Sequence, residues 1–263
     1  MRLMREVRCF PAGDHNTEGT LGSWAGTPGR GGLEMFWVLR ALVEGPLDER
    51  SGYLCDIKLL DRLLRETVVP WLLDEAAGTS AGPGVAGSLR GVFPRAAARC
   101  PQPASLVSLE LAVSPFLRFT AAAGDRTMIQ VTQSFEFSAA HRLHCGDLSD
   151  EENRRLFGKC SNPHGHGHNY VLEVTVAGEP DEHTGTVVSV PRLQQAVHAC
   201  VIHPFDHRNL NLEVAEFRSL NPTVENIARV IWNRLQNEMA PARMDRVRVW
   251  ETPKTYAEYR GDD

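Results

Sequence analysis

The chain has 263 residues, 42% of them hydrophobic and 23% charged, which is enough for one large or two ordinary soluble domains. Its formal net charge is −5 at pH 7 and its lysines and arginines are scattered, which disfavours binding to a nucleic-acid backbone. No run approaches the roughly 20 apolar residues that cross a bilayer, and the start of the chain lacks the apolar core of a signal peptide. We therefore expect a cytoplasmic protein that acts neither on nucleic acid nor at a membrane.

One segment in the first half of the chain lacks helical or strand periodicity. Residues 78–104 are rich in Gly, Pro, Ala and Ser, which predicts a loop. Two β-like runs follow at 106–111 and 116–120, and a break of small residues comes after them. We place a domain boundary there, which gives domains at 1–125 and 126–263.

The second half has its predicted elements in the order ββααββ. The clearest helix start in the chain is Asn-Pro-Thr-Val-Glu-Asn at 221–226. This order predicts an α+β fold, with an antiparallel sheet and helices on one face. The predicted elements are strands at about 128–138 and 167–177, helices at about 189–202 and 222–238, and strands at about 244–251 and 255–260.

An internal repeat at an offset of 133 residues relates the two halves. Strand-turn-helix segments can share turn residues by chance, but we favour duplication because 106–120 also resembles the closing strands of the second half. Eight identical residues pair without a gap, namely Val38, Leu39, Val43, Gly45, Asp48, Glu49, Gly52 and Leu60 with Val171, Leu172, Val176, Gly178, Asp181, Glu182, Gly185 and Leu193.

The polar residues of the second half have no polar counterparts in the first. At the same offset His166 and His168 meet Leu33 and Met35, and Glu251 meets Leu111 when the closing strands are aligned. The first domain is therefore predicted to be a degenerate repeat without a metal site. Its second helix is expected to be missing, because the predicted loop stands in its place.

Histidines and a cysteine cluster in the second half. His166 and His168 project from one face of a strand, because side chains there repeat every second residue. His141 ends another alternating run that can pair beside this strand. Three imidazoles with a fourth position open suit catalytic zinc, whereas Cys160 as a fourth ligand would make a closed structural site. The six cysteines form no CxxC pair, which argues against a disulfide framework.

Residues 128–261 resemble the 6-pyruvoyl-tetrahydropterin synthase family, whose fold is the T-fold. The agreement lies in separate stretches, in order, at 137–143, 148–170, 205–211, 222–226 and 249–252. The resemblance implies a ring of T-folds, so we expect a homo-oligomer with sites at subunit or repeat interfaces. The implied fold of the whole chain is two tandem T-fold-like units, the first degenerate.

The family resemblance also implies a role for each residue of the site. His141, His166 and His168 would hold Zn²⁺, and Cys160 would be the catalytic thiol. Asp206 and His207 would complete a proton relay, and Glu251 would anchor the pterin. The implied reaction converts 7,8-dihydroneopterin triphosphate to 6-pyruvoyl-tetrahydropterin and releases triphosphate, which makes the enzyme a carbon–oxygen lyase.

The residues are suited to these roles on chemical grounds. Zinc lowers the pKa of a bound hydroxyl, and positive charge near Cys160 would stabilise its thiolate. Glu251 follows apolar residues on one face of a strand, where a lone carboxylate needs a partner such as the paired donors of a pterin. Asp206 and His207 are adjacent in sequence, so we expect Asp206 to act through the turn geometry or through another chain rather than by facing His207 directly.

Several alternatives stay open. Thr223 and Glu225 are candidates for substrate binding, but they equally form a helix N-cap. A ligand set with His164 in a Cys-x3-His-Gly-His spacing resembles the 6-carboxytetrahydropterin synthases of the queuosine pathway, which use the same substrate. A non-catalytic zinc or pterin-binding module is a further alternative. Basic residues surround the site in sequence, but a charged loop is often only solvated, so none is assigned to the triphosphate. They are Arg142, Arg154, Arg155 and Lys159.

Overall fold

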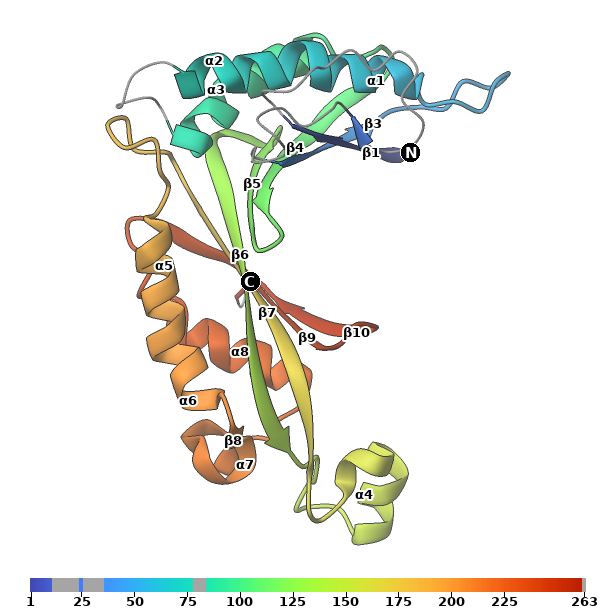
Figure 1. Ribbon diagram of the computed structural model, residues 1–263. Coiled ribbons are helices and arrows are strands. Elements are labelled where there is room, and N and C mark those ends of the chain that lie inside the picture. The colour runs from blue at the N-terminus through green and yellow to red at the C-terminus, as the bar shows by residue number, and fades with distance from the viewer. Residues whose placement is uncertain (11–23, 26–35, 78–83, 262–263) are drawn as a thin grey trace. The chain divides into compact units, whose positions relative to one another are not determined.

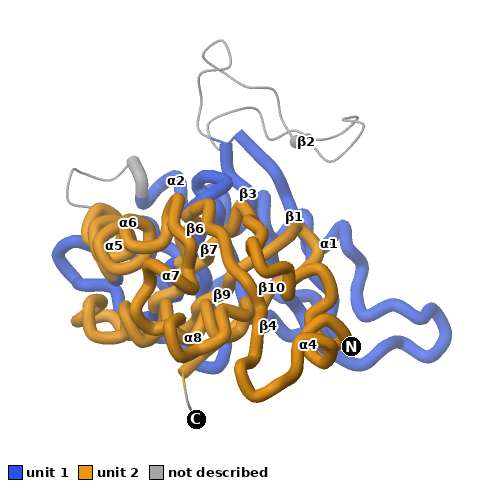
Figure 2. Tube along the Cα trace, turned by 90° about the horizontal axis from the view of Figure 1, so that it is seen from below, with its two compact units in different colours: residues 1–131, 177–187 blue, residues 132–176, 188–263 orange. Residues whose placement is uncertain are grey.

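The chain forms two compact units (Figure 1, Figure 2). Unit 1 comprises Met1–Val131 and Ala177–Val187, and unit 2 comprises Thr132–Val176 and Val188–Asp263. Within the part of the chain that is described, no helix combines the length and apolarity needed to cross a membrane. The computed structural model describes residues 1–10, 24–25, 36–77 and 84–261.

Unit 1 contains strands β1 (Arg2–Cys9), β2 (Trp24–Ala25), β3 (Trp37–Glu44), β4 (Ser105–Ser114) and β5 (Leu117–Ala122). Their order is β5-β4-β3-β1, with antiparallel neighbours, and β2 pairs in parallel with the end of β1. Alternate residues of β3, from Trp37 to Val43, are buried. One face of this sheet therefore forms the core of the unit, as the strand period of two requires.

Three helices of unit 1 lie together beside these strands in Figure 1. They are α1 (Ile57–Leu63), α2 (Val69–Ala77) and α3 (Gly84–Ala98), and a π-helical segment (Leu64–Val68) joins the first two. Asp56 caps α1, because its side chain accepts a hydrogen bond from the backbone N–H of Lys58. Leu60, Leu64 and Val68 are fully buried and fix the helical face that meets the core.

The predicted loop at 78–104 is wrong over most of its length. Residues 78–83 lie outside the described residues, but Gly84–Ala98 is helix α3, so the second helix of this half is present. Small residues allow close packing of this helix. A Cβ on Gly84 would lie 2.8 Å from the carbonyl oxygen of Gly185, and the N–H of Gly87 donates to that same oxygen at 3.3 Å. The Gly and Ala content that resembled a loop is thus a packing surface.

Unit 2 is built on strands β6 (Asp125–His141), β7 (His166–Gly178), β9 (Arg243–Thr252) and β10 (Thr255–Tyr259), of which β6 begins and β7 ends in unit 1. The strand order is β10-β9-β7-β6, and a short strand, β8 (Arg208–Asn209), pairs in parallel with β6. Each of the four long strands matches one predicted from the sequence, and the α+β class with an antiparallel sheet is confirmed.

The helices of unit 2 pack against these strands through apolar side chains. Fully buried residues include Leu193, Phe205, Ile227 and Ile231, with Tyr170 on the facing strand β7. Figure 1 shows α5, α6 and α8 on one side of β6 and β7. The helices are α5 (Val190–Val197), a π-helical segment (His198–Ile202), α6 (His203–Phe205), α7 (Leu210–Glu213) and α8 (Val224–Leu235).

One helix of unit 2 is absent from the elements predicted from the sequence. Helix α4 (Asp150–Phe157) starts with a capping box, in which Ser149 and Glu152 exchange side-chain and backbone hydrogen bonds. This Ser-x-x-Glu spacing is a recognised start signal. Asn153 is buried and binds the backbone of Cys145 at both N and O, so the helix is fastened to the end of β6.

The connections after β3 and β7 share one turn at the predicted offset of 133. The N–H of Gly52 donates to the carbonyl of Asp48 at 2.8 Å, and the N–H of Gly185 donates to the carbonyl of Asp181 at 2.8 Å. In both turns the Asp carboxylate accepts from the backbone N–H and the hydroxyl of the residue three positions on. Both glycines have positive φ, 70° and 62°.

The helices after these turns also correspond. Each unit interrupts its first long helix with five π-helical residues, Leu64–Val68 in one and His198–Ile202 in the other. Buried positions pair at the same offset on either side. They are Leu60 with Leu193, Leu64 with Val197, and Val68 with Val201, all with no exposed surface. Leu33 and Met35, which meet the two chelating histidines at this offset, lie outside the described residues.

Candidate functional site

Three histidines meet where two strands of unit 2 lie side by side. His141 is the last residue of β6, His166 is the first of β7, and His168 follows on the same face. Gly165 makes this approach possible, because its φ is +70° and a Cβ there would lie 2.9 Å from the carbonyl oxygen of His141. The alternation along β7 and the glycine before it thus bring the three rings together.

The geometry of the three rings fits a metal ion. Their ligand atoms all lie within 4.8 Å of one another, and Nε2 of His141 is 3.1 Å from Nε2 of His166. Nδ1 of His166 and Nε2 of His168 are buried without a hydrogen-bond partner among the described residues. Imidazole nitrogens gathered within this distance can ligate a cation, and three imidazoles with an open position suit zinc.

The tautomer of His141 is fixed by the backbone. Its Nδ1 lies 2.8 Å from the carbonyl oxygen of Pro222, which can only accept, so Nδ1 carries the proton and Nε2 keeps its lone pair. Burial lowers the pKa of His141 to about 4. Burial and the neighbouring His168 also lower the pKa of His166. Both rings are therefore neutral near pH 7, which is the state that binds metal.

Glu251 lies beside the triad. It follows the fully buried Val247 and Val249 on β9, and its Oε1 is 3.5 Å from Nε2 of His141 and 3.8 Å from Nε2 of His168. Because burial keeps the His141 ring neutral, its contact with Glu251 is not a full ion pair. The carboxylate therefore keeps acceptor capacity for another donor.

Cys160 lies in a 3₁₀ turn (Gly158–Ser161) that follows α4, and its carbonyl accepts from the N–H of Leu143 just beyond β6. It is half-buried, and within the described chain the metal-ligand cluster comprises the three histidines without it. Burial first, and the Glu251 carboxylate second, raise the pKa of this thiol. The protein alone therefore disfavours the thiolate, and a nearby dication would reverse that balance.

Asp206 and His207 face each other directly, so the expectation that they do not was wrong. Nδ1 of His207 is 2.9 Å from Oδ2 of Asp206, while Oδ1 of Asp206 accepts from the N–H of Ser138 at 2.8 Å. The reason is that His207 adopts a positive φ of 57°, which turns its side chain back on its neighbour. Such a strained conformation often marks a functional residue.

His207 reaches the triad through a shared pocket. A cavity of about 470 Å³ is lined by His168, His207 and the neighbouring strand residues, while Cys160 is absent from the described part of its wall. The backbone of Ser138 in β6 holds both residues, because its carbonyl accepts from the N–H of His207 at 2.6 Å and its N–H donates to Oδ1 of Asp206 at 2.8 Å. The backbone N–H of Ser138 and the His207 ring lower the pKa of Asp206, which favours its charged carboxylate form.

The remaining candidate residues, Thr223, Glu225 and His164, are not among the ligands of the histidine cluster. Thr223 is the N-cap of α8 and accepts from the N–H of Asn226, whereas Glu225 is exposed in the first turn. His164 is exposed and precedes β7, outside the cluster of ligands. Pro222 was not predicted from the sequence, since no pattern reveals which backbone carbonyl a histidine will meet. Nor was Tyr170, whose hydroxyl is 3.4 Å from Nδ1 of His141.

Known proteins match the second half of the chain. The profile of the family described as 6-pyruvoyl tetrahydropterin synthase matches residues 130–262. The 6-pyruvoyl tetrahydrobiopterin synthase of Homo sapiens is 43% identical over 143 residues, which are 54% of this chain and 99% of the human protein. A 6-carboxy-5,6,7,8-tetrahydropterin synthase of Haemophilus influenzae is 28% identical over 153 residues, covering 51% of this chain and 99% of that protein.

A solved structure resembles about half of the chain. The 6-pyruvoyl tetrahydropterin synthase of Caenorhabditis elegans has 40% sequence identity and a TM-score of 0.49, and the match covers 51% of this chain and 96% of that one.

Proposed function

Because the chain belongs to the 6-pyruvoyl tetrahydropterin synthase family, we propose that it is a zinc-dependent lyase acting on 7,8-dihydroneopterin triphosphate. Its products would be 6-pyruvoyl-tetrahydropterin and triphosphate. The observation that carries the proposal is the convergence of three imidazoles, with unpaired nitrogens, beside the carboxylate of Glu251. The 43% identity to the human pyruvoyl-forming enzyme, against 28% to a carboxy-forming one, favours this product.

The residues divide the work of recognition and proton transfer. His141, His166 and His168 would hold Zn²⁺, which when bound acidifies hydroxyl groups of the substrate side chain. Glu251 would accept two parallel hydrogen bonds from the pterin ring and so orient the side chain over the triad. Glu251 would therefore position the substrate and would not transfer protons.

Cys160 would act as the general base. Its thiolate removes a proton from a carbon of the side chain, and the electron pair expels triphosphate as the carbon–oxygen bond breaks. The Asp206–His207 pair would then carry protons between the carbon and oxygen atoms of the side chain as it rearranges. The Asp206 carboxylate keeps His207 oriented through their 2.9 Å contact.

The test is product identification by mass spectrometry after zinc-loaded protein meets 7,8-dihydroneopterin triphosphate. We expect 6-pyruvoyl-tetrahydropterin together with triphosphate. Loss of a two-carbon fragment, for example acetaldehyde, would assign the chain to the 6-carboxytetrahydropterin synthases instead. Zinc binding without any product would favour a non-catalytic zinc or pterin-binding module.

A cysteine pair tests the proposed base. Cys160→Ala should abolish triphosphate release while zinc stays at about one ion per chain. Cys200→Ala, a change at another half-buried thiol of unit 2, should leave turnover unchanged. Retained turnover in Cys160→Ala would contradict the assignment of the thiol.

We further propose that unit 1 is a degenerate T-fold repeat and that the tandem chain assembles with further copies of itself. The shared turn, the matched π-helical segments and the same β-strand connectivity support a duplication. Leu111 of unit 1 stands where Glu251 stands in unit 2, so the carboxylate of the site has no counterpart there. Mass measurement in solution tests the assembly: a fully active monomer would contradict it.

A further inference from the structure

Two asparagines of unit 2 bond to backbone groups beside the histidine triad. They are Asn211 in α7 and Asn226 in α8, and the described cluster of metal ligands includes neither. Their side-chain amides bond to the backbone next to His141 and next to Pro222, whose carbonyl oxygen contacts the His141 ring. Both asparagines are therefore placed to act on the one ring of the triad that has no exposed surface.

The segment around β8 runs along β6 and past the last residue of that strand. Strand β8 pairs in parallel with Ala139 and Ala140, directly before His141. Asn211, two residues after β8, reaches Arg142, directly after His141. The backbone of His141 is therefore attached on both of its sides in the chain.

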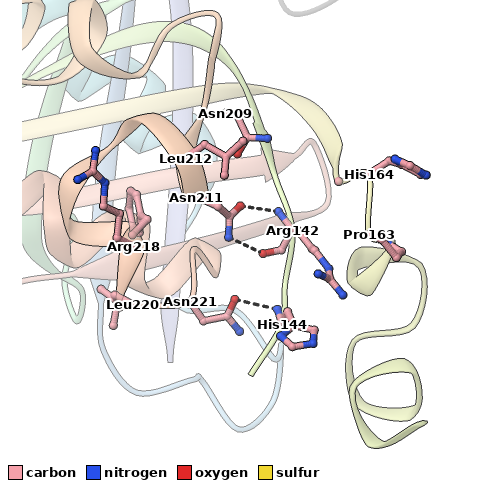
Figure 3. A pocket seen from close by; sticks show the side chains of 12 residues that line it. Arg142, His144, Pro163, His164, Asn209, Asn211, Leu212, Arg218, Leu220 and Asn221 are labelled. Atoms are coloured by element: carbon pink, nitrogen blue, oxygen red, sulfur yellow. Dashed lines mark hydrogen bonds between the residues drawn. The ribbon is translucent and has the colours of Figure 1, made fainter. Parts of the chain in front are cut away.

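Asn211 makes two hydrogen bonds to the backbone of Arg142 (Figure 3). Its Oδ1 accepts from the Arg142 N–H at 2.8 Å, and its Nδ2 donates to the Arg142 carbonyl at 3.0 Å. Strand β6 ends at His141, so the side-chain amide supplies the partners that a neighbouring strand would otherwise supply. The Arg142 N–H belongs to the planar peptide unit that it shares with His141, so this bond fixes the backbone of the ligand itself.

Asn226 holds the segment whose carbonyl group contacts His141. Its Nδ2 donates to the carbonyl oxygen of Asn221 at 2.8 Å, and the N–H of Thr223 donates to the same oxygen at 2.8 Å. The residue between them is Pro222, whose ring restricts φ and whose carbonyl oxygen lies 2.8 Å from Nδ1 of His141. These bonds set the direction of the Pro222 carbonyl, which in turn sets the His141 ring.

The segment that contains Pro222 also bonds to the chain beyond β6. The side chain of Asn221 accepts from the N–H of His144 at 3.2 Å (Figure 3). Asn211 and Asn221 line one pocket of about 350 Å³ together with Arg142 and His144 (Figure 3). The end of β6 is therefore held by amide side chains from two separate segments.

We propose that Asn211 and Asn226 are positioning residues that hold His141 in the orientation required to bind the metal. The proposal rests on the metal site of the proposed function and adds the groups that prepare this site. Nε2 of His141 lies 3.1 Å from Nε2 of His166, while its Nδ1 lies on the Pro222 carbonyl. Because both nitrogens of the ring are engaged, a shift of its backbone would misplace one of them.

The zinc affinity of the full chain, measured by competition with a chromophoric chelator, is the direct test. Asn211→Ala and Asn226→Ala should each weaken zinc binding about 10- to 100-fold. Asn153→Ala is the matched control, because Asn153 makes the same pair of bonds to the backbone of Cys145, at 2.8 and 2.9 Å, further along the chain from His141. This control should lose folding stability and keep its zinc affinity. An equal loss of affinity in the control and the two variants, or no loss in either variant, would overturn the proposal.

A double-mutant cycle shows whether the asparagines act through His141. In a His141→Ala background, Asn211→Ala and Asn226→Ala should cause no further loss of zinc affinity, whereas in a His168→Ala background each should still weaken binding. Equal losses in the two backgrounds would overturn the proposal. Urea unfolding of the metal-free chain checks the fold of each variant. If one variant does not fold, the other tests the proposal, because the two asparagines bond to different segments.

Zinc binding is measured without substrate, so its outcome is separate from that of the proposed function. A wild type that binds zinc with the help of both asparagines but makes no pterin product would remove the lyase and leave the positioning role. An active wild type whose zinc affinity is insensitive to both asparagines would remove the positioning role alone.

Discussion

Units 1 and 2 have the same strand order and the same π-helical interruption, and the same Asp turn follows β3 and β7, yet the residues at the place of the chemistry differ. Leu111 on β4 is 2% exposed and packs in the core of unit 1. The position that aligns with it on β9 is Glu251, whose carboxylate lies 3.5 Å from a histidine. Apolar positions that determine the fold are thus shared, while polar positions that supply a site are not. Fold and function are separable in one chain.

Charged residues on the strands also differ between the two units. Arg40 on β3 is paired with Glu6 at 2.8 Å and also with Glu110. At the offset of 133 its counterpart is Glu173 on β7, which pairs with Arg248 at 3.5 Å. Both units therefore carry a cross-strand charge pair, with arginine on β3 and glutamate on β7. Where Leu111 aligns with Glu251, the partner Arg248 corresponds to Ser108 and not to Glu110. A pair of this kind constrains only complementarity between neighbours, not the sign at either position.

The largest expected effect concerns the ring cluster that distinguishes unit 2. His166→Ala combined with His168→Ala should reduce zinc affinity by more than about 100-fold, because even outer-shell changes cost 10- to 100-fold. Zinc content after dialysis, measured by plasma emission, gives the result. His164→Ala is the matched control, since it removes an exposed ring two residues away. Zinc lost in the control instead would restore the alternative ligand set with His164.

Glu251 and Leu111 occupy aligned positions, so each can be replaced by the residue type of the other. Glu251→Leu should lower kcat/KM about 100-fold or more, while the free energy of unfolding changes by less than about 1 kcal/mol. Leu111→Glu buries an unpaired carboxylate and should destabilise the protein by about 3 kcal/mol or more without affecting the metal. Leu111→Met, the control, should cost less than about 1.5 kcal/mol. Urea unfolding and activity assays measure both; equal loss of stability at the two positions would end the distinction.

The metal-free protein should lose stability in acid because of the triad. Burial lowers the pKa of His141 to about 4, against 6.5 ordinarily, so the unfolded chain binds a proton that the folded chain does not. Stability therefore falls as pH drops from about 6.5 to about 4, by roughly 3 kcal/mol in total for this group. His141→Gln should flatten the pH dependence in urea unfolding, whereas His203→Gln, a change at an exposed ring, should not. A wild-type midpoint that is constant over this range would contradict the prediction.

Period and start signals were sufficient to predict most of unit 2. The alternation at 167–177 and the cap before α8 appear in the structure nearly where the sequence placed them. Helix α3 could not be predicted in this way, because its Gly and Ala residues serve a close approach to Gly185, which is distant in the sequence. Propensity alone ranks such residues as loop formers, and tertiary packing overrides it.

The residues of the site likewise divide into those that the sequence predicts and those that depend on tertiary contacts. His166 and His168 follow from strand parity, and His141 from the end of its own run. The contact of Asp206 with His207 depends on the positive φ of His207, which its residue type does not predict.

The smallest expected effect tests whether the two Asp turns are equivalent. Hydrogen bonds from the turn lower the pKa of Asp48 and of Asp181, so each carboxylate stabilises the fold above its ordinary pKa and loses this effect as pH falls through the lowered value. Asp48→Ala and Asp181→Ala should therefore both cause small losses at pH 7. They should differ in one respect: Gly185, in the second turn, accepts from Gly87 of α3. Hydrogen exchange of the α3 amides should rise in Asp181→Ala and stay unchanged in Asp48→Ala, and the same rise in both would mean that the turns are not locally independent.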